Sequence, residues 1–267
     1  MTDSLPLTIE DPWPALKQFT PARIALGHTG VSLPTQAYLD FQLAHALARD
    51  AVSIPLDFDR LEQRLNGRGY QTLLLQTQAE SHQSYLQRPD LGRRLNSAAV
   101  IKVQQAAQYS KQPDIAVIVA DGLSSTAIEN HAEAFLDLLL PQLLEKGYSR
   151  TPVCLVKHGR VSCGDPVAEI FAALMCIVLI GERPGLSSPD SMGIYFTYRA
   201  KSGCTDADRN CISNIHKNGL SYQQALHKLL FLIGKADQSG FSGVLLKDES
   251  TDSSVDRLER RSNFLLE

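Results

Sequence analysis

The sequence predicts an α/β fold, in which a mainly parallel β-sheet carries helices on both faces and follows a smaller helical N-terminal domain. In the second half of the chain, apolar runs at residues 114–122, 151–159 and 176–185 alternate with helix-like segments. Strands that are apolar along their whole length are typical of a sheet buried on both faces, and alternation with helices indicates parallel connections. The first hundred residues contain mostly helical patterns instead.

The N-terminal part divides into an arm and a helical domain. An extended arm is expected over residues 1–20, because this segment and the residue after it hold four of the 13 prolines. Three segments then have helical patterns: residues 35–52, 59–69 and 81–110. In the first of them, Leu39, Leu43 and Leu47 are spaced four apart, so that one helix face is apolar. We therefore expect a mainly helical domain over residues 21–110.

The second domain is expected over residues 111–247, and a polar tail over residues 248–267. The predicted elements of this domain are strand 114–122, helix 124–147, strand 151–159, helix 165–174, strand 176–185, edge strand 192–200 and helix 221–236. This order gives a parallel sheet with helical connections, closed by one edge strand and a last helix. The tail is rich in charged residues and serine, which is typical of a loose terminus.

The composition excludes several classes of function. The chain has 267 residues and a net charge of -3, with acidic and basic residues interspersed, so no basic surface is available for nucleic acid. Its apolar stretches are shorter than the roughly 20 residues that a membrane span needs. Five cysteines, an odd number without a CxxC motif, favour reduced thiols. We therefore expect a cytoplasmic globular protein that binds neither nucleic acid nor membrane.

The ends of the three apolar strands form the expected ligand site, because such sheets bind ligands beyond the carboxyl ends of their strands. The loops there read ADGLSS from Ala120, KHGRVSCGD from Lys157 and GERPGLSS from Gly181. They lack the GxGxxG and P-loop patterns, so neither a dinucleotide nor a nucleoside triphosphate is indicated. Many backbone donors, an arginine and a glutamate, without an activated nucleophile, favour a binding site for a large polar cofactor.

Two other interpretations of these loops remain open at this point. The GLSS segment resembles part of a nucleophile elbow, which would make the protein a stand-alone α/β hydrolase with Ser124 as its nucleophile. The second glycine of that motif is missing, however, so Ser124 is predicted to cap a helix. The second and third loops also carry four charged or titratable side chains: His158, Arg160, Glu182 and Arg183. On composition alone, a buried ion-pair network explains these side chains as well as a ligand site does.

Six segments carry a resemblance to a known family. In sequence order they are ARIALGHTGVSLPTQAYLDFQLAHALARDAV, YLQRPDLGRRL, ADGLSSTAI, LVKHGRV, LIGERPGL and DADRNCISNIHKNG. Together they resemble the light (small) subunit of ethanolamine ammonia-lyase, and the resemblance runs from about Pro21 to Gly240. The resemblance implies that residues 111–247 form a Rossmann-like domain that binds adenosylcobalamin. It also implies the heavy subunit of that enzyme as the partner.

The resemblance further implies an activity that this chain has only in a complex. In the family, a hetero-oligomer of several heavy–light pairs converts ethanolamine to acetaldehyde and ammonia through radicals generated from adenosylcobalamin. The heavy subunit holds substrate and radical, and the light subunit closes on the cofactor, so this chain is expected to supply no catalytic residue and no metal ligand. The cofactor carries the difficult chemistry and the protein orients it. The complex is expected in the cytoplasm, either free or inside a bacterial microcompartment.

The cobalamin contacts of the family correspond to Val161, Glu182 and Cys211 in this sequence. Val161 would pack on the cofactor, and Glu182 would either accept hydrogen bonds from its amide groups or hold a neighbouring loop. Cys211 would be a packing contact and not a redox centre. Three further residues are expected to orient the loops: Arg160, Arg183 and Asn214.

Two departures from the family pattern and one absence bear on this mapping. The segment of residues 191–210 is shorter than the family pattern predicts, which leaves the contacts of residues 195–204 unassigned. The sequence SCGDP at residues 162–166 is also unusual for the family. The DxHxxG motif of cobalamin mutases does not occur in the sequence. We therefore expect the cofactor to bind with its own base still on cobalt, as in the family.

Overall fold

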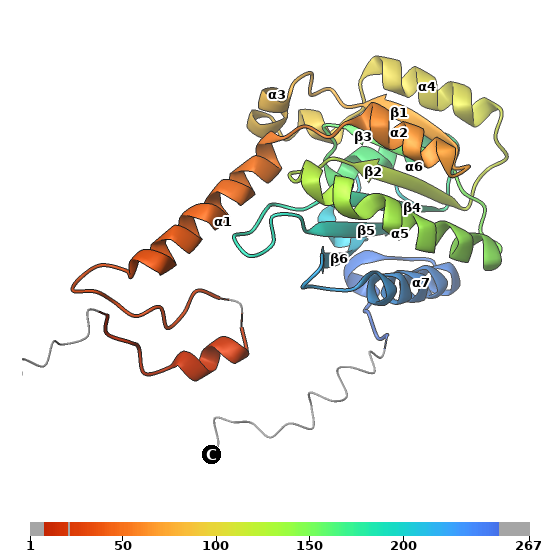
Figure 1. Ribbon diagram of the computed structural model, residues 1–267. Helices are drawn as coiled ribbons and strands as arrows, with labels where there is room; N and C mark the ends of the chain where they lie inside the picture. Colours follow the sequence, from red (N-terminus) through yellow and green to blue (C-terminus); the bar gives the residue numbers. More distant parts are fainter. Residues whose placement is uncertain (1–7, 21, 251–267) are drawn as a thin grey trace, which may run out of the picture.

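A six-stranded sheet with the strand order β1-β3-β2-β4-β5-β6 forms the centre of the protein (Figure 1). The structure is a computed structural model that describes residues 8–20 and 22–250. The strands are β1 (Thr72–Gln76), β2 (Ile115–Ala120), β3 (Val153–Lys157), β4 (Met175–Gly181), β5 (Met192–Tyr198) and β6 (Arg209–Ile215). The helices are α1 (Thr35–Ser53), α2 (Phe58–Gly67), α3 (His82–Gln87), α4 (Ser97–Gln108), α5 (Ser125–Glu145), α6 (Gly164–Phe171) and α7 (Tyr222–Ser239).

The sheet is mixed, so the α/β class is confirmed, but the Rossmann-like parallel character predicted for the sheet is not. Strands β1, β3, β2 and β4 are parallel, whereas β5 pairs antiparallel with β4 and β6 pairs antiparallel with β5. The reason is local. No helix of the described residues crosses over between β4 and β5, so the loop of residues 182–191 returns the chain directly alongside β4. The strand predicted over residues 192–200 is therefore an inner strand, and β6 forms the edge.

A separate helical N-terminal domain is not confirmed, because the first part of the chain contributes β1 to the sheet. The five residues of β1 pair in parallel with β3, from Thr72 opposite Val153 to Gln76 opposite Lys157. The helices predicted in this region do form, as α1, α2, α3 and α4. A short apolar run between two helical patterns carries little periodicity, and for that reason the sequence analysis missed β1.

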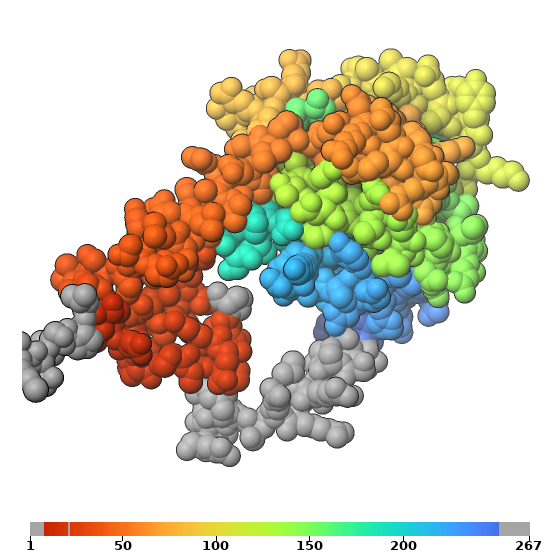
Figure 2. Space-filling model, in the orientation of Figure 1, coloured from red at the N-terminus to blue at the C-terminus, as the bar shows by residue number. Residues whose placement is uncertain are grey.

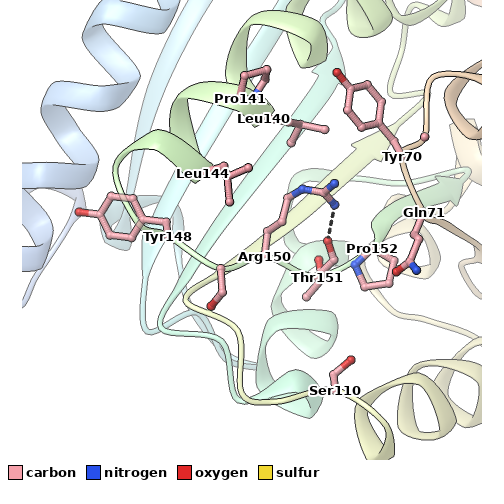
Figure 3. A pocket seen from close by; sticks show the side chains of 12 residues that line it. Tyr70, Gln71, Ser110, Leu140, Pro141, Leu144, Tyr148, Arg150, Thr151 and Pro152 are labelled. Atoms are coloured by element: carbon pink, nitrogen blue, oxygen red, sulfur yellow. Dashed lines mark hydrogen bonds between the residues drawn. The ribbon is translucent and has the colours of Figure 1, made fainter.

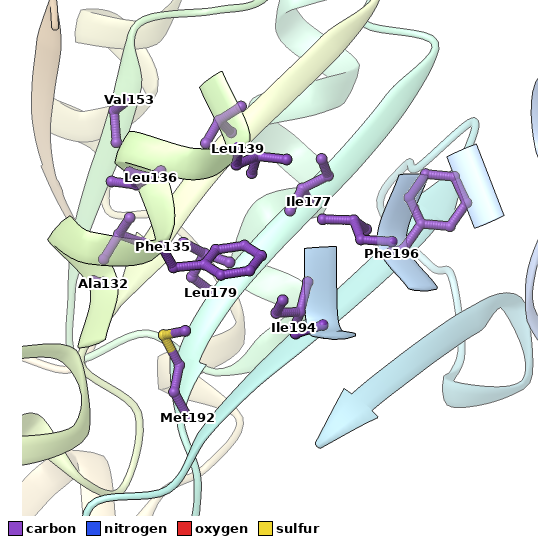
Figure 4. Close-up of a cluster of buried hydrophobic side chains, with 14 of the residues drawn as sticks. Ala132, Phe135, Leu136, Leu139, Val153, Ile177, Leu179, Met192, Ile194 and Phe196 are labelled. Carbon is purple, nitrogen blue, oxygen red and sulfur yellow. The ribbon is translucent and has the colours of Figure 1, made fainter. Parts of the chain in front are cut away.

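Two hydrophobic cores, one on each face of the sheet, account for its fully apolar strands. Along β2, Ile115, Val117 and Val119 belong to one core, and the alternate residues belong to the other. Helices α2, α5 and α7 cover the first face, and α4 and α6 cover the second. Figure 4 shows Phe135 and Leu139 of α5 packed over strands β4 and β5. The prediction of helices on both faces is therefore correct.

A buried ion pair fixes the antiparallel edge to the rest of the fold. Arg209, the first residue of β6, donates to both carboxylate oxygens of Asp165 on α6, at 2.7 and 2.6 Å. Arg209 also donates to the hydroxyl of Thr197 on β5, at 3.2 Å. Both charges are almost fully buried, so each compensates the desolvation of the other. This contact keeps β6 in place beside the strand ends that carry the site.

The N-terminal arm and α1 extend away from the sheet, as Figures 1 and 2 show. The segment predicted as extended contains the 3₁₀ helix Pro14–Gln18, and Ile9 forms a β-bridge with His28. The first seven residues of that segment lie outside the described residues, as does the predicted polar tail from residue 251 onward. Among the described residues, no helix has both the length and the apolar character for crossing a membrane.

Candidate functional site

The loops that follow β2, β3 and β4 meet at the carboxyl edge of the sheet and enclose a cavity of about 430 Å³. The cavity is lined by Tyr85, Gly122, Leu123, Arg160, Val161, Ile180, Gly181, Glu182, Arg183 and Tyr195. Four of these, from two loops, are residues that the sequence analysis selected: Arg160, Val161, Glu182 and Arg183. The fold thus brings together side chains that are about twenty positions apart in the sequence, because the carboxyl ends of neighbouring parallel strands share an edge.

Two glycines allow the loops after β2 and β4 to pack directly on each other. A Cβ atom on Gly122 would lie 2.1 Å from the carbonyl oxygen of Gly181, and one on Gly181 would lie 2.0 Å from that of Ser124. Gly122 also has a φ of +63°, a conformation that other residues rarely adopt. The amide of Leu123 donates to the Gly181 carbonyl at 3.0 Å. No side chain larger than hydrogen fits at either position, so these glycines set the floor of the cavity.

Asp121 ties the loop after β3 to the end of β2. Its carboxylate accepts hydrogen bonds from the backbone amides of Gly122 at 3.0 Å, His158 at 2.9 Å and Gly159 at 2.9 Å. Burial raises the pKa of Asp121 to about 6, although the three amide donors oppose that rise. Sequence reasoning did not select this residue. A carboxylate directly after a fully apolar strand and before a glycine was the available signal.

Arg160 stands against an aromatic wall of the cavity. Its guanidinium carbon lies 4.2 Å from the ring centroid of Tyr85, and Nη2 donates to the Tyr85 carbonyl at 3.3 Å. The Tyr85 hydroxyl in turn donates to the Gly159 carbonyl at 3.3 Å, and burial raises the pKa of Tyr85. Within the described residues, the buried Nε of Arg160 has no hydrogen-bond acceptor. The tyrosine was missed by sequence analysis because it comes from α3, far away along the chain.

Glu182 is held by one carboxylate oxygen and leaves the other available. Its Oε2 accepts from the hydroxyl of Ser191 at 2.6 Å and from the amide of Asn214 at 3.2 Å. Oε1 accepts no hydrogen bond from residues 8–20 or 22–250, and it lies 2.8 Å from where a Cβ on Gly193 would be. Glu182 therefore braces the start of β5 and the end of β6, and not its neighbour Arg183.

The ion-pair interpretation of the charged cluster is not supported. The ion pairs of the described residues join other side chains, and none involves Arg160, Glu182 or Arg183. Nδ1 of His158 forms a hydrogen bond with the carbonyl oxygen of Ala79 at 3.0 Å, and burial lowers the pKa of His158. The charges that face the cavity are thus not neutralised by one another.

Cys211 and Asn214 lie beside the cavity on β6 and do not line it. Cys211 is opposite Tyr195 in the β5–β6 register, with its thiol in hydrogen-bond contact with the Tyr195 hydroxyl. Partial desolvation by its neighbours raises the pKa of that thiol. Asn214 has a φ of +66°, and its side chain bonds to His216. Tyr195, whose contacts the sequence analysis left unassigned, separates Cys211 from the cavity.

Ser124 has the environment of a helix cap and loop anchor. It is completely buried, its Oγ accepts from the amide of Ala127 at 3.2 Å and donates to the carbonyl of Pro189 at 2.8 Å. His131 pairs with the hydroxyl of Tyr222 at 2.7 Å and lies 3.3 Å from Asp190. No histidine contacts Ser124 in the described part of the chain, so the hydrolase alternative is not supported. These contacts instead tether the loop of residues 182–191 to α5.

A larger cavity, of about 550 Å³, lies at the other end of the sheet (Figure 3). Leu140, Leu144 and Tyr148 line it on one side, and Tyr70 and Arg150 on the other. This cavity opens where β3 begins, at the amino ends of the parallel strands. None of the residues selected from the sequence reaches it. Because ligands of α/β sheets bind at the carboxyl ends, we place the functional site at the smaller cavity.

The sequence matches the ethanolamine ammonia-lyase light-chain family over residues 10–247. It is 52% identical to the ethanolamine ammonia-lyase small subunit of Pseudomonas aeruginosa strain LESB58 over 259 residues, which cover 96% of this chain and 95% of that protein. It is 51% identical to the small subunit of Pseudomonas putida strain F1, with 97% of both chains covered. The small subunit of Azotobacter vinelandii is 49% identical, with 100% and 99% covered.

Proposed function

Because the chain belongs to the family of ethanolamine ammonia-lyase light chains and is the small subunit of that lyase, we propose that its carboxyl-edge cavity forms part of an adenosylcobalamin site. The large subunit would complete that site. A corrinoid is much larger than a cavity of about 430 Å³. This chain therefore holds only a portion of the cofactor. When bound, adenosylcobalamin supplies the radical that starts the conversion of ethanolamine to acetaldehyde and ammonia.

The polar groups that face the cavity suit the amide side chains of a corrinoid. Oε1 of Glu182 is an acceptor that the described residues leave unused, and Nε of Arg160 is a donor without an acceptor. An amide offers both a carbonyl oxygen and an NH₂ group, and its NH₂ group can donate to Oε1 of Glu182. Val161 and the rings of Tyr85 and Tyr195 supply apolar wall. We assign Cys211 and Asn214 an indirect part, through Tyr195 and Glu182 respectively.

The unused carboxylate oxygen of Glu182 is the observation that carries this proposal. Its test is the variant Glu182→Ala in the co-expressed complex of large and small subunits. A hydrogen bond to a charged group contributes about 1.5–3 kcal/mol, so the apparent dissociation constant for adenosylcobalamin should rise about 10- to 100-fold. The KM for ethanolamine should stay within about twofold, since the substrate site is assigned to the large subunit.

Glu169→Ala is a matched control for this experiment. Like Glu182, Glu169 accepts from a serine hydroxyl and a backbone amide, here the Oγ of Ser202 at 2.7 Å and its amide at 3.0 Å. It lies on α6, away from the cavity. The control should leave the cofactor affinity unchanged. If Glu182→Ala also binds cobalamin as the parent does, Glu182 is not part of the site.

The assembly and its location form the last part of the proposal. The name of the relatives, small subunit, implies a large subunit as partner. By the resemblance of the sequence to the family, we assign a hetero-oligomer of several large–small pairs in the cytoplasm, either free or within a microcompartment. Light scattering on the purified complex gives its mass, and a mass equal to one pair would contradict the higher assembly.

A further inference from the structure

The N-terminal arm and α1 expose an unusual amount of apolar surface. Of the twenty large hydrophobic side chains that are exposed among the described residues, twelve lie between residues 9 and 54. They are Ile9, Trp13, Leu16, Phe19, Val31, Leu33, Tyr38, Leu39, Phe41, Leu43, Leu47 and Ile54. Over the described residues up to 54, only Ala51 is buried. Such a concentration of exposed apolar side chains in one part of the chain is typical of an interaction site.

A regular stripe on α1 is the most ordered part of this surface. Leu39, Leu43 and Leu47 are 54%, 63% and 49% exposed, and their spacing by four places them along one side of the helix. Ala51, one turn beyond Leu47, is where the helix enters the body of the protein. Figure 1 shows the rest of α1 projecting from that body. Among residues 8–20 and 22–250, the stripe therefore has no partner that buries it.

A second copy of the same helix is a poor partner for this stripe. Two such helices would pair as a coiled coil along positions spaced alternately three and four apart. That seam would run from Leu39 and Leu43 to Ala46 and Asp50. The second half of that seam would bury the small side chain of Ala46 and the carboxylate of Asp50, and no cation of the seam would pair with that carboxylate. Anchors at every fourth position instead suit a single helix lying in an apolar groove of a larger protein.

The position of the arm indicates which protein supplies the groove. The guanidinium Nη2 of Arg23 in the arm donates to the carbonyl of Leu186, at 3.5 Å. Leu186 is itself 37% exposed and belongs to the loop of residues 182–191, which starts at Glu182. In Figure 2 the surface of α1 runs directly beside that of the body. The arm thus contacts the loop that carries Glu182, which lines the cavity that the large subunit is proposed to close.

We infer that the Leu39–Leu43–Leu47 stripe of α1 docks in an apolar groove of the large subunit. The arm then acts as a clamp beside the cofactor site, and the exposed leucines are buried only in the complex. This inference rests on the proposed function in one respect, because it takes the large subunit as the partner. It does not depend on which residues bind the cofactor.

The test is a triple variant, Leu39→Gln, Leu43→Gln and Leu47→Gln, in the full chain co-expressed with the large subunit. Glutamine keeps the helix propensity and removes only the apolar contact. A tag on the small subunit captures the complex, and mass photometry over a dilution series gives the dissociation constant. The triple variant should raise that constant about 100-fold or more. The matched control is Gln42→Ala with Arg49→Ala, on another side of the same helix, and should change it less than about threefold.

Three further measurements keep the inference falsifiable. Circular dichroism and thermal unfolding of the isolated variant should match the parent, because the replaced side chains are exposed. Parent-like binding of the large subunit by the triple variant would overturn the inference. So would a variant that changes only the self-association of the small subunit. Cobalamin titration of the variant complex at saturating subunit concentration should match the parent, whereas a failure of the proposed cofactor site would appear with Glu182→Ala alone.

Discussion

Helices α1 and α5 have similar lengths, 19 and 21 residues, but opposite environments. Ten residues of α5 are buried, and its apolar face packs on strands β4 and β5. A single residue of α1, Ala51, is buried, although leucines recur along one side of it. The comparison shows that an apolar helical pattern predicts burial without specifying the partner. The described residues explain the burial of α5, whereas those same residues leave most of α1 exposed.

The largest expected effect is a difference in stability between one substitution made in each helix. Leu139 on α5 is completely buried and Leu43 on α1 is 63% exposed. Leu139→Ala should lower the free energy of unfolding of the isolated chain by about 2–5 kcal/mol, because it leaves a cavity in the core. Leu43→Ala should change it by less than about 0.5 kcal/mol. Chemical denaturation measures both, and equal losses would mean that α1 packs on the body in solution.

The second prediction concerns pH and the residue at the base of α5, Asp121. This carboxyl group ionises near pH 3.8 when unfolded and near pH 6 in the fold, where burial opposes its charge. Between these values the folded state keeps a proton that the unfolded state has released. Its contribution to stability, about 3 kcal/mol, is therefore complete below the unfolded pKa and is lost as the pH rises through 6.

Comparison with Asp121→Asn isolates this contribution, because the asparagine does not titrate. The free energy of unfolding of the parent, minus that of the variant, should fall between pH 4 and pH 7 and be constant from about pH 7 to pH 8. Urea denaturation at five pH values across this range measures the difference. A difference that does not depend on pH would show that the Asp121 carboxylate is not buried as the structure places it.

The sequence predicted the parts of the fold whose environment is uniform. Strands β2, β3 and β4 are buried on both faces, so each is an unbroken apolar run that can be recognised without knowing its neighbours. Strand β6 was not predicted because it lies at the edge and buries only every third residue, Arg209, Ile212 and Ile215, so its sequence RNCISNI has no apolar run. The antiparallel direction of β5 was not predicted either, because it depends on the path of the loop of residues 182–191 and not on the strand itself.

The same distinction holds for the candidate site. Arg160, Glu182 and Arg183 could be grouped from the sequence because a general property of parallel sheets puts their loops at one edge, whereas Val161 was selected only through the family resemblance. Tyr85 and Asp121 could not, since their roles depend on particular contacts, with the Arg160 guanidinium and with the amides of the next loop. The periodicity of a sequence predicts which face of a helix or strand is apolar, but it does not predict which side chains contact one another.

The smallest expected effect comes from removing a single tyrosine hydroxyl. The comparison is between a hydroxyl that pairs with a buried side chain of α5 and an exposed hydroxyl on α1. Tyr222→Phe removes the hydroxyl that pairs with Nδ1 of His131 at 2.7 Å and keeps the edge-to-face ring contact. His131 is only 6% exposed, so its Nδ1 would be left without a partner, at a cost of about 1 kcal/mol in the free energy of unfolding. Because His131 also lies 3.3 Å from Asp190 in the loop that carries Glu182, cobalamin affinity in the complex should fall about threefold, less than for Glu182→Ala.

Tyr38→Phe on α1, where the ring is 51% exposed, should leave the stability of the isolated chain unchanged. If both variants lose the same free energy of unfolding, the buried polar contacts of α5 do not distinguish it from α1. The contact that tethers the loop of residues 182–191 to α5 would then not contribute to stability.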